Sequence, residues 1–295
     1  MSAQIIDGAQ AAAEIRAEVK ATAALLKEQH GVIPGLATVL VGDNPASHAY
    51  VRAKRKMCAE LGLESFGHEL AAETSEAEVV SLMRALSADP RVHGILVQLP
   101  LPAHISEEAV LREVVLEKDV DGFNPVNIGR LGMKNRVPTF APCTPSGVIE
   151  LLRRSGTVMD GAHAVVLGRS NIVGLPVSLL LLGANATVSV CHSRTHDIGA
   201  LTRQADILVA AIGRTRFVTA EMVKPGAVVI DVGINEIADA NRKSGRRLVG
   251  DVDFDAVKEV AGAITPVPGG VGPMTIAMLM KNTLTAAQRI VAGHH

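Results

Sequence analysis

Aromatic side chains are scarce in this sequence of 295 residues, which contains five phenylalanines, one tyrosine and no tryptophan. So few rings leave little with which to stack the bases of a nucleic acid. An excess of one charge is also missing, because 29 Lys and Arg stand against 30 Asp and Glu, a net charge of −1. Nucleic-acid affinity rests mostly on clustered cations, so we expect no nucleic-acid partner. With 48% hydrophobic residues, the core must be aliphatic.

Cysteine is sparse as well. Cys58, Cys143 and Cys191 lie far apart and form no CxxC pair, which excludes a disulfide framework and a zinc knuckle and suits a reducing compartment. The first twenty residues are too polar for a secretory signal peptide. Residues 170–193 contain no charged residue, but Gly and Pro interrupt them and the apolar pattern changes at Gly183. This pattern predicts a buried helix followed by a buried strand. We therefore expect a cytoplasmic chain that does not enter a membrane.

Apolar runs alternate with helical patterns along the chain, which is the rhythm of a parallel sheet with helical crossovers. The first half predicts helices over residues 9–29, 47–61 and 75–88 and strands over residues 36–41 and 94–98. The second half predicts helices over residues 146–154 and 274–291 and strands over residues 164–167, 187–191, 207–211 and 227–231. Glycine and proline crowd residues 119–145, where we place the connection between two domains. The expected fold class is α/β, with a doubly wound second domain.

The second domain begins with a strand, a glycine turn and a helix, and such a turn presents free backbone N–H groups to an anion. The turn runs from Gly168 through Arg169 to Gly174, with Ser170 where a dinucleotide fingerprint has its second glycine. A tight turn without a ligand is the alternative. Its position at the first strand of a βαβ series favours a nucleotide site. At the position where NAD enzymes offer an acid to the ribose, this chain has Ser193 in Cys-His-Ser-Arg-Thr. This favours NADP over NAD.

Two residues of the first domain suggest acid–base chemistry. Tyr50 and Lys54 are spaced i, i+4 and so share one face of a helix. A solvated basic helix is the alternative, since other Arg and Lys residues surround them. Tyr50, however, lies just after a loop that ends a strand, where α/β folds collect ligands. A lysine desolvated in such a cleft can act as a general acid–base.

Other polar residues have weaker signals. Gln98 ends an apolar strand and points either to the crevice or to the sheet edge. Asp119 and Asp121 would share a face of an extended backbone, and His192 and His196 are spaced i, i+4, so both pairs are conceivable metal ligands. Nothing completes either set, and we expect no metal. The glycine-rich loop over residues 266–273 has no GK[ST] ending, so it is a hinge or lines a site but is not a P-loop.

Taken together, these motifs resemble one family, that of bifunctional methylenetetrahydrofolate dehydrogenase/methenyltetrahydrofolate cyclohydrolase. The resemblance runs from about Tyr50 to Thr275 and rests on motifs in the family's order. They are SHAYVRAK, VQLPLP, KDVDGFNP, PCTP, GRSNIVGLP, CHSRT, IDVGIN, GDVDF and PVPGGVGPMT.

The resemblance implies a folate-binding catalytic domain over residues 1–143 and 274–295 and a Rossmann-like NADP-binding domain over residues 144–273. It implies that Lys54 is the catalytic lysine, Gln98 its hydrogen-bond partner and Tyr50 a wall near the folate rings. The further residues implied to bind substrate are Asp121, Leu99, Pro100, Pro268 and Gly269. The residues implied to bind NADP are Gly168, Arg169, Ser170, Ile172, Val173, Ser193 and Ile234.

The implied reaction oxidises 5,10-methylenetetrahydrofolate with NADP and then hydrolyses the methenyl product to 10-formyltetrahydrofolate. The implied partners are tetrahydrofolate derivatives and a second copy of the chain in a homodimer. The chain ends in His294 and His295, to which we assign no role.

Three alternatives remain open. A short-chain dehydrogenase also uses a YxxxK pair, but there the pair follows the nucleotide-binding turn, whereas Tyr50 precedes Gly168 here. A monofunctional dehydrogenase of the same family would lack the lysine at position 54. A non-catalytic regulator that binds folate or nucleotide would retain the same motifs.

Overall fold

The structure, a computed structural model, describes residues 2–239 and 245–293, and the chain divides into two compact units. One comprises Ala13–Cys143 and Ile276–His295 and contains a three-stranded sheet, so we call it the three-stranded unit. The other comprises Met1–Ala12 and Thr144–Thr275 and contains a six-stranded sheet, so we call it the six-stranded unit.

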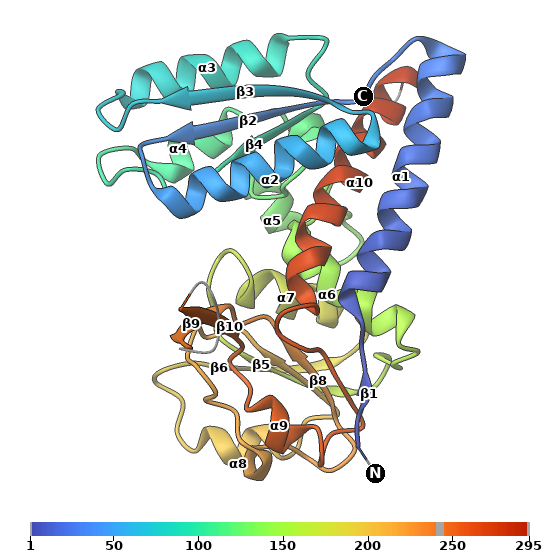
Figure 1. The fold of residues 1–295 in the computed structure, drawn as a ribbon, viewed down its shortest axis with the longest axis vertical. Coiled ribbons are helices and arrows are strands. Elements are labelled where there is room, and N and C mark those ends of the chain that lie inside the picture. The colour runs from blue at the N-terminus through green and yellow to red at the C-terminus, as the bar shows by residue number, and fades with distance from the viewer. Residues whose placement is uncertain (1, 240–244, 294–295) are drawn as a thin grey trace. The chain divides into compact units, whose positions relative to one another are not determined.

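The three-stranded unit is built on the parallel sheet β3-β2-β4. Its strands are β2 (Gly35–Val41), β3 (Glu64–Leu70) and β4 (Gly94–Val97). Ala37 and Val39 of β2 pack against Val79 and Met83 of α3, while α2 covers the other face of the sheet (Figure 1). The helices are α1 (Gly8–His30), α2 (Pro45–Leu61), α3 (Glu76–Ala88), α4 (Glu107–Arg112), α5 (Pro125–Leu131) and α10 (Val271–Val291), of which α1 and α10 begin in residues of the other unit; a 3-10 turn, η1, spans Leu116–Lys118.

Strand β3 was not predicted from the sequence. It lies at the edge of the sheet and its residues, ESFGHEL, are exposed or only partly buried. A continuous run of apolar residues predicts a strand that is buried, such as the central strand β2, every residue of which is buried. The exposed strand β3 has no such run. Residues 119–145 are also more structured than expected, because α5 lies within them. The boundary between the units falls at their end, between Cys143 and Thr144.

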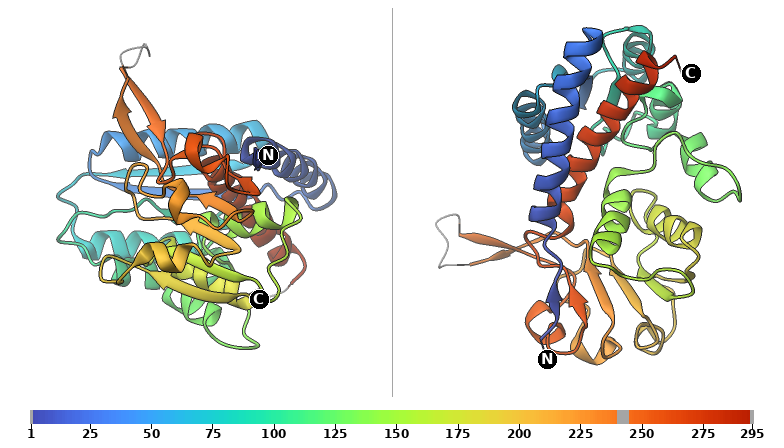
Figure 2. Two further views of the ribbon diagram at one scale, coloured as in Figure 1. Left: turned by 90° about the horizontal axis from the view of Figure 1, so that it is seen from below. Right: turned by 90° about the vertical axis from the view of Figure 1, so that its right-hand side faces the viewer.

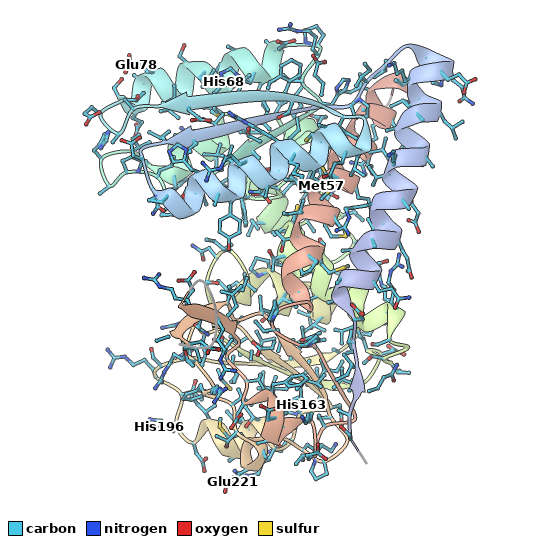
Figure 3. The ribbon with its side chains drawn as sticks, in the orientation of Figure 1. Met57, His68, Glu78, His163, His196 and Glu221 are labelled. Atoms are coloured by element: carbon cyan, nitrogen blue, oxygen red, sulfur yellow. The ribbon has the colours of Figure 1, made fainter. Side chains whose placement is uncertain are left out.

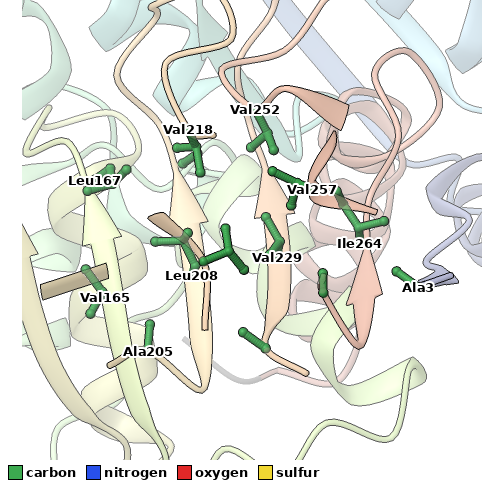
Figure 4. Close-up of a cluster of buried hydrophobic side chains, with 14 of the residues drawn as sticks. Ala3, Val165, Leu167, Ala205, Leu208, Val218, Val229, Val252, Val257 and Ile264 are labelled. Carbon is green, nitrogen blue, oxygen red and sulfur yellow. The ribbon is translucent and has the colours of Figure 1, made fainter. Parts of the chain in front are cut away.

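The six-stranded unit contains an all-parallel sheet in the order β1-β11-β8-β7-β5-β6. Its strands are β1 (Gln4–Ile5), β5 (His163–Leu167), β6 (Thr187–Cys191), β7 (Ile207–Ala210), β8 (Val228–Asp231) and β11 (Ala263–Ile264). The chain passes from β5 to β6 on one side and then returns to place β7 on the other side of β5. This reversal makes a topological switch point, and doubly wound folds bind ligands outside the carboxyl ends of the strands there. Aliphatic side chains, among them Val165, Leu208 and Val229, form the core under the sheet (Figure 4).

The remaining elements of this unit connect its strands. They are α6 (Cys143–Arg154), α7 (Gly174–Gly183), α8 (Ile198–Thr202), α9 (Phe254–Val257), the 3-10 turn η2 (Ala220–Met222) and the strands β9 (Asn235–Ala238) and β10 (Arg246–Val249). The helix and strand predicted over residues 170–193 are α7 and β6. The prediction that this strand is buried was wrong, because β6 lies at the edge of the sheet and only Cys191 in it is buried. Strands β9 and β10 pair antiparallel as a ribbon that projects from the rest of the unit (Figure 2).

The first residues differ from the expected domain limits. We expected residues 1–143 in one domain, whereas Met1–Ala12 belong to the six-stranded unit. The reason is that β1 pairs in parallel with β11, with Gln4 opposite Ala263 and Ile5 opposite Ile264. Two residues of strand are too short for a periodic signal, so this pairing was invisible in the sequence.

Two expectations that came from the composition can be compared with the structure. Cys58, Cys143 and Cys191 are free and buried, so none forms a disulfide. Among the described residues, no helix is both long and apolar enough to cross a membrane. His294 and His295 lie outside the described residues.

Candidate active site and cofactor cavity

Lys54 and Gln98 meet in the three-stranded unit. Lys54 lies on α2 with 8% of its surface exposed, and its Nζ donates to Oε1 of Gln98 over 3.0 Å. Gln98 directly follows β4, and its Nε2 donates to the carbonyl of Leu99 over 2.9 Å. That second bond fixes the orientation of the amide, so the oxygen faces the lysine. The predicted pairing of these two side chains is present in the structure.

Burial and nearby charges shift the pKa of Lys54 in opposite directions. Burial lowers the pKa of Lys54, while the nearby Asp121 carboxyl and the Cys143 thiol act to raise it. Burial in turn raises the pKa of Asp121, and Lys54 opposes that shift. Burial, followed by the Asp121 charge, raises the pKa of Cys143 well above its usual range. The lysine therefore sits where proton transfer needs it, partly desolvated beside a carboxyl group.

Asp119 and Asp121 do not form a pair. Asp119 is 3% exposed, and its carboxylate accepts from the backbone N–H groups of Phe123 and Asn124 and from Nδ2 of Asn127 over 2.7–3.1 Å. Burial raises the pKa of Asp119 to about 7 despite these donors. Asp119 thus organises the loop that carries Asp121, which faces Lys54 instead. A metal site on these two aspartates gains no support, because Asp119 turns its oxygens to donors of its own loop.

Residues near the pair complete this part of the site. Tyr50 stands one helical turn before Lys54 on α2 and is 49% exposed. Leu99 is partly buried and Pro100 is exposed, directly after Gln98. Asn282 of α10 was not predicted as part of the site. Its Nδ2 donates to the carbonyl of Val120, the residue before Asp121, over 2.8 Å.

The six-stranded unit has a cavity of about 310 Å³ at its switch point. Gly168, Arg169, Ser170 and Ser193 line it, all predicted to bind the cofactor. Sequence reasoning missed Arg214, which lines the same cavity in the loop after β7. No acidic residue occurs among the described residues that line it, and two of the lining residues are arginines. The cavity therefore fits an anionic nucleotide, including one with a phosphate on its ribose.

The glycine turn is built as the dinucleotide fold requires. Gly168 has a φ of +113°, and a Cβ there would lie 2.2 Å from the carbonyl oxygen of Ala211. A Cβ on Gly174 would lie 2.4 Å from the oxygen of Gly168, so this glycine provides the close packing of helix and strand. Ser170 Oγ accepts from the N–H groups of Val173 and Gly174 over 3.1 and 3.3 Å. Ile172 and Val173 follow in the turn but are not among the residues lining the cavity.

A second cavity in this unit, of about 210 Å³, is lined by three further residues that were predicted to bind ligands. Ile234, predicted to bind the cofactor, shares its wall with Pro268 and Gly269, predicted to bind substrate. The structure thus brings together residues that the resemblance assigned to two different ligands.

The histidine pair gains no support as a metal site. His196 is exposed and lies at the edge of its unit (Figure 3), and Nδ1 of His192 accepts from the backbone N–H of Arg194. Over residues 2–239 and 245–293, no group of three or more His, Cys, Asp or Glu side chains is placed to hold a metal ion.

Comparison with known proteins gives one consistent result. Residues 6–121 match the catalytic domain of tetrahydrofolate dehydrogenase/cyclohydrolase, and residues 142–291 match the NAD(P)-binding domain of the same family. The bifunctional protein FolD 2 of Arabidopsis thaliana is 56% identical over 289 residues, which cover 98% of this chain and 97% of that protein. The bifunctional FolD protein of Moorella thermoacetica is 55% identical over 98% of this chain and 100% of its own length.

Solved structures agree. The FolD dehydrogenase/cyclohydrolase of Trypanosoma brucei, solved with NADP cofactor and an inhibitor, superposes with a TM-score of 0.94 at 46% identity over 99% of both chains. The bifunctional enzyme of Campylobacter jejuni gives a TM-score of 0.92 at 46% identity over 98% of this chain and 100% of that one. These matches and the site geometry lead to one conclusion: the chain belongs to the tetrahydrofolate dehydrogenase/cyclohydrolase family.

Proposed function

We propose that this protein oxidises 5,10-methylenetetrahydrofolate with NADP and hydrolyses the resulting 5,10-methenyltetrahydrofolate to 10-formyltetrahydrofolate. The observation that carries the proposal is the buried Lys54, held 3.0 Å from Gln98 and beside Asp121. Hydride transfer depends on positioning, whereas hydrolysis requires proton transfer, so a desolvated lysine at this place favours an enzyme that also hydrolyses.

The hydrolytic step assigns the lysine its task. Water adds to the methenyl carbon between N5 and N10 of the folate, and Lys54 in its neutral form takes a proton from that water. The bond from the carbon to N5 then breaks, and the protonated lysine returns a proton to N5. As the C=O of the formyl group forms on N10, the remaining hydroxyl proton is lost, and this is the one proton released to solvent overall. The bond to Gln98 holds the ammonium group in place during both transfers.

The oxidative step depends on positioning more than on acid–base help. NADP accepts a hydride when it is bound, and the residues that would hold it are Gly168, Arg169, Ser170, Ser193 and Ile234, followed in the turn by Ile172 and Val173. Arg169 at the cavity wall and the absence of an acid among the described lining residues favour a ribose phosphate.

Folate recognition is assigned to both units. We assign Asp121 to the hydrogen-bond donors of the pterin ring and Tyr50 to a wall against the ring system. Leu99 and Pro100 shape the site beside Gln98. We also assign Pro268 and Gly269, which line the smaller cavity of the six-stranded unit, to substrate binding.

We further propose a homodimer joined through the six-stranded units, and a location in the cytoplasm. Three buried, free cysteines accord with a reducing compartment. One relative, the bifunctional FolD 4 of Arabidopsis thaliana, is named as chloroplastic, so the compartment varies among relatives.

One assay tests the catalytic proposal. Purified protein is mixed with 5,10-methylenetetrahydrofolate and NADP, and the absorbances of NADPH and methenyltetrahydrofolate are followed in one cuvette. We expect NADPH to accumulate and supplied methenyltetrahydrofolate to decay faster than in buffer. Accumulation of both products would identify a monofunctional dehydrogenase, and no change in either would indicate a binding protein without catalysis.

A further inference from the structure

Two buried carboxylates are nested at the carboxyl end of β8. Asp231, the last residue of that strand, accepts at Oδ1 from the N–H groups of Gly233 and Asp251, both over 2.9 Å. Its Oδ2 accepts from the N–H of Val252 over 3.0 Å. Asp231 therefore fixes the backbone on either side of the Asp251 side chain.

Asp251 in turn binds two segments that are far from it in sequence. It is 0% exposed, and its Oδ2 accepts from the N–H groups of Ile212 and Gly213 over 2.7 and 2.9 Å. Its Oδ1 accepts from Nδ2 of Asn235 over 2.9 Å. All three bonds go from neutral donors to a charged acceptor, which makes each stronger than a neutral hydrogen bond.

The backbone is shaped to admit both carboxylates. A Cβ on Gly233 would lie 2.4 Å from the Asp251 carboxyl carbon, and one on Gly250 would lie 1.8 Å from Oδ2 of Asp231. Glycine at these two positions lets the acids approach the main chain. This close packing around a fully buried side chain indicates that Asp251 holds the surrounding backbone in place.

The segments that Asp251 holds are cavity walls. Ile212 lines the cavity at the switch point, beside Gly168 and Arg169. Gly233 and Ile234, directly before Asn235, line the second cavity. One side chain thus ties together a wall of each.

We propose that Asp251 is a positioning residue for the nicotinamide cofactor: it does not touch the cofactor but fixes the 212–213 and 233–235 segments in the geometry that binds it. This inference rests on the proposed function, since it takes the cavity at the switch point and Ile234 of the second cavity to bind the cofactor. Preorganised walls lower the cost of ordering them when the ligand arrives. Nothing in this role concerns Lys54, so the hydrolytic reaction, which consumes no cofactor, provides an internal reference.

The test is the variant Asp251→Asn in the full chain. The amide has nearly the same size, but it carries no charge, and its NH2 group must face N–H donors on one side. We expect the dissociation constant for NADPH, measured by fluorescence titration, to rise about ten- to a hundredfold. The KM for NADP should rise with it, while the cyclohydrolase kcat stays at the wild-type level. The matched control is Asp255→Asn, which removes an exposed carboxylate that pairs with Lys258.

The outcomes separate the two levels of the proposal. Wild-type protein that binds no NADPH contradicts the proposed function and this inference together. Wild-type binding with an unchanged constant in Asp251→Asn contradicts the inference alone, as does an equal loss of both activities in a variant that still folds. If Asp251→Asn does not fold, Asn235→Ala decides. It removes one donor, and weaker NADPH binding with normal cyclohydrolase activity supports the inference, whereas unchanged binding overturns it.

Discussion

Nζ of Lys54 and Oε1 of Gln98 lie 3.0 Å apart although 44 residues separate them in the sequence. Helix α2 brings the lysine and the end of strand β4 brings the glutamine, so the fold of the three-stranded unit creates the pair. Because the Leu99 carbonyl holds the other end of the amide, Gln98 offers the lysine an acceptor and not a donor. The pair is therefore suited to holding an ammonium group.

Lys54→Met should separate the two activities. Methionine keeps the length of the apolar stem but removes the proton carrier. Since general acid–base help is worth roughly 10²–10⁴-fold, the cyclohydrolase kcat should fall by about that factor. The dehydrogenase rate should fall less. Lys56→Met on the same helix, where the lysine is exposed and pairs with Glu60, is the control and should match the wild type. Normal cyclohydrolase activity in a folded Lys54→Met protein would refute the role of Lys54.

Gln98→Glu should move the pH dependence of hydrolysis. A negative charge at this position stabilises the ammonium form of Lys54 and raises its pKa. If the neutral lysine accepts the first proton, the limb of the pH–kcat profile that rises with pH should shift to higher pH. The measurement is the cyclohydrolase kcat as a function of pH, since burial lowers the pKa of Lys54 from its usual value. An unshifted profile would mean that Lys54 does not set the rate.

Arg169→Ala should weaken NADP more than NAD. A charge-assisted contact to a phosphate is worth about 1.5–3 kcal/mol, so the kcat/KM for NADP should fall by roughly ten- to a hundredfold. The value for NAD should change little, because NAD lacks the 2′-phosphate that NADP carries on its adenosine ribose. Arg153→Ala, an exposed arginine of α6, serves as the control. Equal kcat/KM values for the two cofactors in the wild-type protein would contradict the assigned preference.

Asp231 should make stability depend on pH. Burial raises its pKa from 3.8 to about 7 in the folded protein. The unfolded chain therefore loses this proton near pH 4 and the folded chain only near pH 7, so the stabilisation is complete below pH 4 and is lost as the pH rises to about 7. A shift of this size corresponds to at most about 4 kcal/mol. Between pH 5 and pH 8, the thermal midpoint of the wild type should fall relative to that of Asp231→Asn. A constant difference would show that the pKa is not raised.

The sequence determined the class of the fold and singled out Lys54 as the candidate catalytic lysine. Alternating apolar runs and helical patterns are local signals, so β2, β4 and four of the six strands of the larger sheet, β5 to β8, were predictable. The motif that contains Tyr50 and Lys54 also lies within one helix, and its spacing is fixed by the helical repeat. The turn after β5 was recognisable because its glycines are close in sequence and Gly174 packs against Gly168 within the same turn.

Only the tertiary structure decided the rest. The edge strand β3 is polar, and β1 has two residues, so their pairing depends on partners distant in the sequence. No local pattern distinguishes the roles of Asp119, Asp231 and Asp251 in the sequence. Their roles follow from which N–H groups surround them once the chain is folded, and for Asp231 and Asp251 donors come from distant segments. The physical reason is that burial and hydrogen-bond partners set what a carboxylate does, and both are properties of the packed chain rather than of any local pattern.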